Sequence, residues 1–425
     1  MKPTHPQCLF SCLATGALLI APGCTNTAPR SEAPPVESAQ PLEGCDAVEL
    51  EPPTPGEGVQ VQIEMPLGPG EERQACRLVL VDQAVNLNWS EGLYTRGSHH
   101  GLTARTSYRD QLPTENIRGE FVEDASQLAT CETIGADWDV QGIIAGGHAV
   151  GASPRTALHS KGSLPDDVAL RIRAGEVLAL NFHMINVTDK PIRACYKQNL
   201  YSIPDQQVKH EAGTMFYYNS FLALPARQKT RATMACPVQH DVWLGDQVSH
   251  MHKRGVAYHA SLLDGDPLSG GKEIATLYDT KEWEEPIARV DSPALLLKAG
   301  QWIRWTCEFE NREDRNVAQG QETTDEMCMF VGTYWPRTPE MDWCMTPNSG
   351  SSYTASRLLA EGTGDGAQFL ECWNESPQIV RGGGAESAEA RYATQRCFTQ
   401  SCAAVSGRVQ EFGPGKLDPT KISCD

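Results

Sequence analysis

Most of the chain between residues 44 and 347 alternates apolar and polar positions with a period of two. In GVQVQIEM, residues 58–65, valine, isoleucine and methionine alternate with glutamine and glutamate. In QWIRWTCEFEN, residues 301–311, large hydrophobic side chains alternate with charged or polar ones. This period is typical of strands that bury one face. Turn clusters such as NVTDKP and LDGDPLSGG separate the runs, so the pattern predicts many short strands.

These strands predict an all-β protein with two consecutive antiparallel β-sandwich domains of jelly-roll type. The chain has 425 residues, which exceeds one ordinary domain, and the strand pattern breaks near residues 203–215. We therefore assign the first sandwich to residues 44–205 and the second to residues 206–347. Residues 348–425 read as a short cysteine-rich tail with a predicted helix around SAEARYATQRCF.

The N-terminus predicts export. Residues 1–23 resemble a lipoprotein signal peptide, with an apolar run that is too short to span a membrane. The run ends in LIAPGC, which resembles a bacterial lipobox and predicts lipidation of Cys24; ordinary signal cleavage beside an incidental cysteine is the alternative. Residues 24–43 are rich in Pro, Ala, Ser and Glu, as in a flexible tether. We expect a protein of the bacterial cell envelope that meets the membrane only through its lipid anchor.

Charge and cysteine usage narrow the class of protein. The net charge of −18 argues against a nucleic-acid partner, because a strongly acidic chain offers little basic surface for phosphates. Removing Cys8 and Cys12 with the signal peptide and Cys24 as the anchor leaves twelve of the fifteen cysteines. An even number in an exported chain indicates disulfide bonds.

Two histidine pairs supply the candidate chemistry. His250 and His252, in QVSHMHKRG, share one face of a strand about 6.5–7 Å apart, so their rings can converge on one ion. Such a pair alone is more often two solvated strand residues. His99 and His100 are adjacent and would face opposite ways on a regular strand. They can bind one ion only if the backbone bulges, as the flanking glycines permit.

Two further residues extend this set. His183 ends an apolar strand on the face that it shares with Asn181, opposite the large hydrophobic side chains. Met327 lies in TTDEMCMFVGTYWP, close to the end of the strand-rich region.

The order of these motifs resembles the copper type II ascorbate-dependent monooxygenases, the family of dopamine β-hydroxylase and peptidylglycine α-hydroxylating monooxygenase. The shared order is His-His, a strand histidine, His-x-His, then DEMC before an aromatic-Pro pair, over about residues 44–347. The resemblance implies two copper ions on two β-sandwiches that face a solvent-filled cleft. The implied ligands of the electron-transfer copper are His99, His100 and His183. Those of the copper at the reaction centre, the catalytic residues, are His250, His252 and Met327.

The ligand types agree with copper, because imidazole suits both oxidation states and a thioether favours Cu(I). Zinc fits less well, since methionine is a poor zinc ligand. The resemblance implies hydroxylation of a C–H bond in a small organic substrate by O2, with ascorbate or another one-electron donor. The arginine and tyrosine of the peptide-amidating members are replaced by Val248 and Val331, which argues against peptide amidation. The alternatives are a non-enzymatic copper-binding envelope lipoprotein and a catalytically lapsed, ligand-binding member of the same fold.

The resemblance also implies four disulfides, among which a Cys307–Cys328 bridge would tie the Met327 strand to a neighbouring strand. The implied pairs are Cys45–Cys195, Cys76–Cys131, Cys236–Cys344 and Cys307–Cys328. The tail cysteines, Cys372, Cys397, Cys402 and Cys424, allow three connectivities, which stay open. We interpret His148 as a loop residue near the first site, and a supporting role beside the metal ligands is the alternative. The other histidines are interpreted as ordinary surface or packing residues: His159, His210, His240 and His259.

Overall fold

A computed structural model of the chain describes residues 44–345, except for 96–97, 118, 132–137, 149–154, 157–158, 160, 220–221, 225 and 268–269. The predicted signal peptide, Cys24, the tether and the tail with its four cysteines lie outside the described residues. All described residues belong to one compact unit. Among the helices in that part of the chain, none is long and apolar enough to cross a membrane.

The first sandwich consists of two sheets. Its elements are η1 (Cys45–Ala47), β1 (Gly58–Leu67), β2 (Glu72–Leu80), β3 (Val85–Tyr94), β4 (Ser98–Arg109), β5 (Ala129–Thr130), β6 (Val140–His148), β7 (Arg155–Thr156), β8 (Val168–Ile172), β9 (Glu176–Ile185), β10 (Ile192–Ser202), η2 (Asp205–Gln207) and β11 (His210–Glu211). The outer sheet has the order β1-β10-β3-β8-β11, with β7 paired to β3, and the inner sheet has the order β5-β2-β9-β4-β6.

The second sandwich repeats this plan. Its elements are β12 (Gly213–Tyr218), β13 (Ala223–Leu224), β14 (Lys229–Pro237), β15 (Val242–Met251), β16 (Gly255–Leu263), β17 (Glu273–Thr280), β18 (Arg289–Leu297), β19 (Trp302–Glu310), β20 (Val317–Ala318), β21 (Cys328–Trp335), η4 (Pro339–Met341) and β22 (Trp343–Met345). The inner sheet has the order β18-β15-β21-β12-β22, the outer sheet has the order β14-β19-β16-β17, and β13 pairs with β20.

The predicted all-β class is confirmed. The strand pairs are antiparallel except for β11 with β8 and β12 with β22, which are parallel. The chain passes between the sandwiches at Ala212, because β11 pairs within the first and β12 pairs within the second.

Successive side chains along an inner strand point alternately into the core of its own sandwich and toward the other sandwich. On β9, Leu178, Leu180 and Phe182 fill the core of the first sandwich, as the sequence predicts. On β19, Ile303 and Trp305 belong to the buried cluster between the two sheets of the second sandwich. Each strand therefore gives one face to its own sandwich, as a period of two requires.

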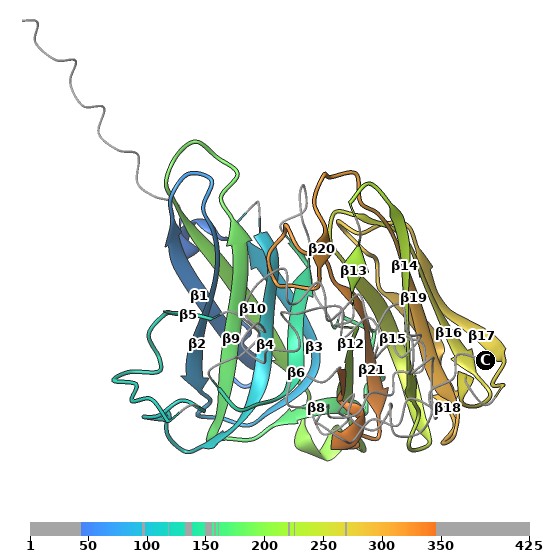
Figure 1. Cartoon of the computed structure of the whole chain (residues 1–425). Coiled ribbons are helices and arrows are strands. Elements are labelled where there is room, and N and C mark those ends of the chain that lie inside the picture. Colours follow the sequence, from blue (N-terminus) through green and yellow to red (C-terminus); the bar gives the residue numbers. More distant parts are fainter. Residues whose placement is uncertain are drawn as a thin grey trace, which may run out of the picture. The chain divides into compact units, whose positions relative to one another are not determined.

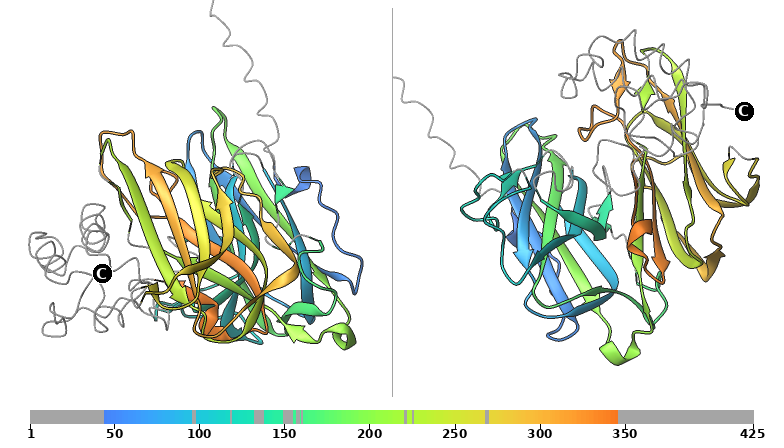
Figure 2. Two further views of the ribbon diagram at one scale, coloured as in Figure 1. Left: turned by 90° about the vertical axis from the view of Figure 1, so that its right-hand side faces the viewer. Right: turned by 60° about the horizontal axis from the view of Figure 1, so that its bottom comes forward.

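The opposite faces of the two inner sheets pack against each other. Their apolar side chains form one buried cluster, which we call the interface cluster: Leu78, Ala104, Ala125, Trp138, Ile143, Val177 and Ala179 from the first sandwich, and Phe216, Tyr218, Met327, Met329 and Val331 from the second. Figure 1 shows β4 and β6 near β12 and β21, and Figure 2 shows the two groups of strands from further sides. The interface cluster makes this contact a dry one.

Four disulfides brace the fold, and they are the pairs that the resemblance implies: Cys45–Cys195, Cys76–Cys131, Cys236–Cys344 and Cys307–Cys328. The expected role of the last one needs correction. It joins β19 to β21, which lie in different sheets, so it crosses the core of the second sandwich and does not link neighbouring strands.

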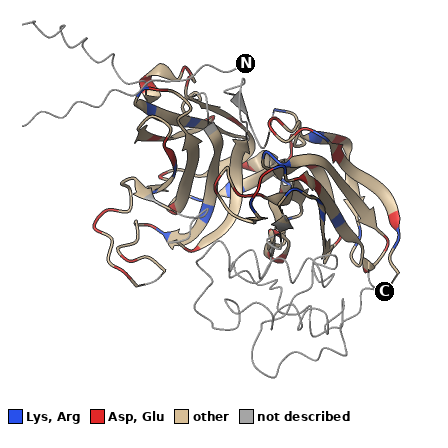
Figure 3. Cartoon of the chain, turned by 45° about the horizontal axis from the view of Figure 1, so that its top comes forward, with Lys and Arg blue, Asp and Glu red and all other residues tan. Residues whose placement is uncertain are grey.

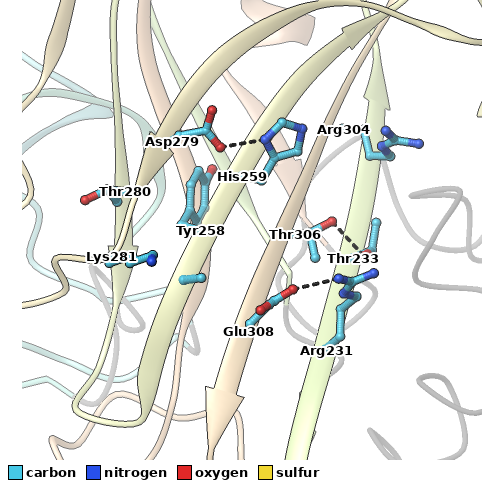
Figure 4. A pocket seen from close by; sticks show the side chains of 11 residues that line it. Arg231, Thr233, Tyr258, His259, Asp279, Thr280, Lys281, Arg304, Thr306 and Glu308 are labelled. Carbon is cyan, nitrogen blue, oxygen red and sulfur yellow. Dashed lines mark hydrogen bonds and ion pairs between the residues drawn. The ribbon is translucent and has the colours of Figure 1, made fainter.

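The outer sheet of the second sandwich carries a polar groove of 610 Å³ on its solvent face. Figure 4 shows its side chains paired with one another: His259 with Asp279 at 2.6 Å, and Arg231 with Glu308 at 2.6 Å. Acidic and basic residues are similarly interspersed over the described strands and loops (Figure 3). The groove is therefore explained by surface ion pairs that stabilise strand pairing.

Removing the Cys307–Cys328 bridge by a double substitution to alanine should lower the free energy of unfolding by about 3 kcal/mol, because a short loop is released. The bridge closes a sequence separation of 21, against 150 for Cys45–Cys195. Removing the longer bridge should therefore cost more, about 5 kcal/mol. Denaturant unfolding of both variants measures the losses; an unchanged midpoint without Cys307 and Cys328 would contradict the prediction.

The His259→Gln substitution should lower stability in acid and not in base. Burial opposes the charge, but hydrogen bonds to Asp279 and Glu273 outweigh it and raise the pKa of His259. A raised folded-state pKa gives stability that is present below the unfolded pKa and is lost as pH rises through the folded pKa. The pair is solvent-exposed, so we expect a loss below about 1 kcal/mol near pH 5 that disappears near pH 9. Urea unfolding at both pH values is the measurement, and an equal loss at both would count against this account.

Candidate metal centre

Two neighbouring strands of the first sandwich carry three of the candidate ligands. His99 and His100 lie on β4, His183 lies on β9, and the ladder pairs His100 with His183. The register shifts by one residue between Ser98 and His100, so the bulge that adjacent histidines need is present. Both histidines can therefore face the second sandwich.

The three rings direct nitrogen atoms toward one position. Nδ1 of His99 and Nδ1 of His183 are 3.0 Å apart. One nitrogen atom from each of the three rings lies within 4.8 Å of the others, and all three side chains are buried. Because metal–nitrogen bonds are about 2.0 Å long, nitrogen atoms at this spacing can bind one ion.

Hydrogen bonds fix the tautomers of two of these rings. Nε2 of His183 lies 2.9 Å from Oε1 of Glu72, and Nε2 of His100 lies 3.0 Å from Oδ1 of Asn181. These oxygens accept, so each Nε2 donates its proton and each Nδ1 keeps its lone pair for a metal. The Asn181 amide in turn donates to both sulfur atoms of the Cys76–Cys131 disulfide, which holds it in place.

The His-x-His motif lies at the end of β15 in the second sandwich. The Nδ1 proton of His252 is donated to the carbonyl oxygen of Asp325 at 3.2 Å. The other nitrogen, Nε2, is buried and has no hydrogen-bond partner among the described residues. An unsatisfied buried polar atom costs about 1–3 kcal/mol, and coordination of a metal would remove that cost. The orphaned nitrogen therefore fits a metal ligand.

Met327 lies directly before β21 and is 3% exposed, within the interface cluster. The ladder between β15 and β21 pairs Met251 with Cys328. The same register, continued by one residue, sets Met327 opposite His252. Two motifs that are distant in the sequence are thus neighbours at one end of the inner sheet.

The two groups of ligands meet across the interface. The ring of His99 lies 4.6 Å from that of His252 and 5.6 Å from that of His250, measured between centroids. His99, His250 and His252 also have ring nitrogens within 4.8 Å of one another. His99 therefore belongs to both groups, and the five rings form one histidine cluster: His99, His100, His183, His250 and His252.

The solvent-filled cleft that the resemblance implies is not what the described residues show. Each member of the histidine cluster is at most 9% exposed. The physical reason is the interface cluster, whose apolar side chains bring the inner sheets into contact and exclude water.

Burial keeps four rings of the histidine cluster neutral: His99, His100, His250 and His252. Burial, then the charges of neighbouring imidazoles, lowers the pKa of His99, His100 and His250 well below the ordinary value. Burial lowers the pKa of His252 to about 3. These rings are uncharged at neutral pH, so protons do not compete with a metal for their lone pairs.

His148 lies near the first site, as the sequence analysis expects, but on a strand and not in a loop. It ends β6, is the ladder partner of His100, and its ring lies 4.5 Å from that of His250. Its Nε2 proton is donated to the carbonyl oxygen of Trp283 in the second sandwich, at 3.0 Å. Burial lowers its pKa to about 4. The expected loop position was wrong, because the Gly-Gly before His148 hides the strand pattern.

His159 also spans the two sandwiches. It is fully buried, with Nε2 donating to the carbonyl oxygen of Ile144 and Nδ1 lying 2.9 Å from Oγ1 of Thr333. It is a packing residue, whereas the sequence analysis left open whether it lies on the surface or in a packed position. His210 and His240 lie on the surface, and His259 lines the polar groove.

Two carboxylates that the sequence analysis did not single out hold the site together. Glu72, beside His183, also accepts hydrogen bonds from the backbone and hydroxyl of Thr323 in the second sandwich, at 2.8 and 3.0 Å. Burial opposes its charge, but the bonds from His183 and Thr323 outweigh it and lower the pKa of Glu72. Burial raises the pKa of the second carboxylate, Glu326, to about 7. A sequence signal existed for Glu326 alone, because it lies within the DEMC motif.

Two solved structures show a weak similarity to this chain. The major capsid protein P2 from bacteriophage PM2 is 10% identical, with a TM-score of 0.25 over 65% of this chain and 97% of that chain. A putative secreted protein from Eubacterium rectale is 8% identical, with a TM-score of 0.18 over 66% of this chain and 70% of that chain. Similarities at this level carry no argument about function.

A family comparison is more informative. Residues 211–357 match the family described as copper type II ascorbate-dependent monooxygenase, C-terminal domain. The matched range begins just before β12, where the second sandwich begins, and contains His250, His252 and Met327. The second sandwich is therefore similar to the C-terminal domain of the copper type II ascorbate-dependent monooxygenases.

Proposed function

We propose that the protein is a copper- and O2-dependent monooxygenase that hydroxylates a C–H bond of a small organic substrate, with ascorbate or another one-electron donor. One observation carries the proposal. The histidine cluster is buried at the contact of two sandwiches, beside Met327, and its second half lies in the range that the monooxygenase family model matches.

The donor set fits two copper ions. His99, His100 and His183 would hold the first, because His100 and His183 donate their Nε2 protons elsewhere and keep the Nδ1 lone pair for a metal. His250, His252 and Met327 would hold the second, which explains the orphaned Nε2 of His252. Copper bound by imidazole and thioether supplies one-electron chemistry for the reduction of O2.

The remaining residues keep the site dry and the rings in place. Glu72 and Asn181 hold protons on the outer nitrogens of His183 and His100, so those rings cannot turn away. The interface cluster excludes water, which protects an oxidation from side reactions.

The face of β15 and β21 that packs at the interface cluster limits which substrates fit beside the second site. Val248 and Val331 are direct partners on β15 and β21, and both belong to or pack against the interface cluster. A substrate carboxylate placed there would be desolvated beside two valines, which is costly. We therefore propose a substrate that presents an apolar group at this position, and not a peptide carboxylate.

We also propose that the protein is exported and lipid-anchored at the bacterial cell envelope. The proposal rests on residues 1–24 and on the four disulfides, which persist in oxidising compartments.

A non-enzymatic copper-binding lipoprotein is the second candidate. The burial of all five histidines favours it, because a substrate reaches them only if the sandwiches separate. Oxygen consumption by the copper-loaded protein with ascorbate, across a panel of candidate substrates, separates the two functions. Copper binding without substrate-dependent oxygen uptake would support the second.

The Met327→Ile substitution should abolish oxygen-dependent turnover and weaken Cu(I) binding at one site only. Isoleucine keeps an apolar side chain in the interface cluster but removes the sulfur, which is a soft ligand for Cu(I). Competition titration with a Cu(I) chelator and an oxygen electrode measure the two effects. Met329→Ile is the matched control, because Met329 is equally buried in the same cluster. Full activity in the Met327 variant would show the site assignment to be wrong.

The His183→Ala substitution should separate copper binding from turnover. The second site keeps its ligands and should still bind copper, whereas the first loses one of three, so electron delivery should fail. Metal analysis and steady-state rates are the measurements, with the exposed His210→Ala as control. Two bound copper ions together with an unchanged rate would rule out this role for His183.

A further inference from the structure

Glu326 is a fully buried carboxylate beside the ligands of the second site. We propose that Glu326 is a positioning residue, which holds His252 and Met327 in the relative place that a shared metal ion needs. The inference rests on the proposed function, since it takes both residues as ligands of one copper.

The carboxylate binds the main chain of both ligands through a single oxygen atom. Oε2 accepts a hydrogen bond from the backbone N–H of His252 at 3.0 Å and one from the backbone N–H of Met327 at 3.3 Å. The two ligands lie in segments separated by 75 residues, and the Glu326 carboxylate connects the main chains of both.

The other oxygen completes the arrangement. Oε1 accepts the backbone N–H of Arg254 at 2.8 Å, and the Arg254 guanidinium lies 3.5 Å from it. Backbone N–H groups of His252 and Arg254 thus point at one anion from the turn that follows β15, which is a nest for negative charge. The turn takes this shape around the carboxylate, so the place of His252 depends on it.

Arg254 clamps the same two segments from the other side. Its guanidinium donates to the carbonyl oxygens of Asp325 and Thr324, both at 3.1 Å, and to Glu313 at 2.6 Å. The residues before Met327 are therefore fixed to the turn that bears His252 at several points. Glu326 is the point closest to both ligands.

The test uses the full chain loaded with Cu(I) and reads the sulfur contribution in the copper X-ray absorption spectrum. In Glu326→Gln the amide nitrogen replaces one acceptor by a donor, so one set of backbone N–H groups loses its partner. We expect the sulfur contribution to fall and Cu(I) affinity at one site to drop by about 10–100-fold, as for other groups that orient metal ligands. First-site affinity should stay unchanged.

Two further variants keep the test decisive. Glu326→Asp keeps the charge but has a shorter side chain, so it should lose part of the sulfur contribution. This variant provides the test if Glu326→Gln does not fold. Asp342→Asn is the matched control, because Asp342 is a buried carboxylate of the same sandwich, 2% exposed, that is held by Arg337 and Tyr334. It should keep the full sulfur contribution.

The outcomes separate this inference from the proposed function. A wild-type protein without a copper–sulfur contribution would overturn the site assignment itself. A wild-type protein that has it, with both Glu326 variants unchanged, would overturn only the positioning role. An equal loss in Asp342→Asn would also overturn that role, because general loosening of the sandwich would then explain the effect.

Discussion

The contact between the two inner sheets is the interaction on which the candidate metal centre depends. Neither sandwich alone can bury its outward face, because β9 and β21 carry apolar side chains on both sides. Packing these faces together removes the apolar surface from water and encloses the histidines at one place. Neutral rings, the orphaned nitrogen of His252 and the short distances across the interface all follow from that enclosure.

Enclosure makes the few charged groups at the site unusually important. A buried carboxylate must be hydrogen-bonded. Glu326 is fully buried and is bonded to the backbone of two ligands, and the half-buried Glu72 is bonded to the ring of His183. Glu72 joins His183 of the first sandwich to Thr323 of the second, whereas Glu326 works within the second sandwich. Glu72 thus connects the first site to the second sandwich, and Glu326 connects the two chain segments that carry the ligands of the second site.

The sequence predicts which side chains share a face of a strand better than it predicts which residues of other strands they contact. A period of two correctly predicts that His183 and Asn181 share one face of their strand. The adjacent His99 and His100 predict a bulge, and β4 has one. The sequence could not show that the two ligand groups touch, since that depends on which sheet faces pack together. The contacts of Glu72 and His148 could not be predicted for the same reason, because their partners Thr323 and Trp283 belong to the other sandwich.

Each of the four disulfides joins two residues of the same sandwich. Among the described residues, the covalent connection between the halves is the main chain at Ala212, and everything else that joins them is reversible. The halves therefore behave as tethered binding partners at a high effective concentration. Their separation would break no covalent bond, and reclosure would be an intramolecular encounter. The contact between the two sandwiches is thus a reversible barrier between solvent and the buried histidines.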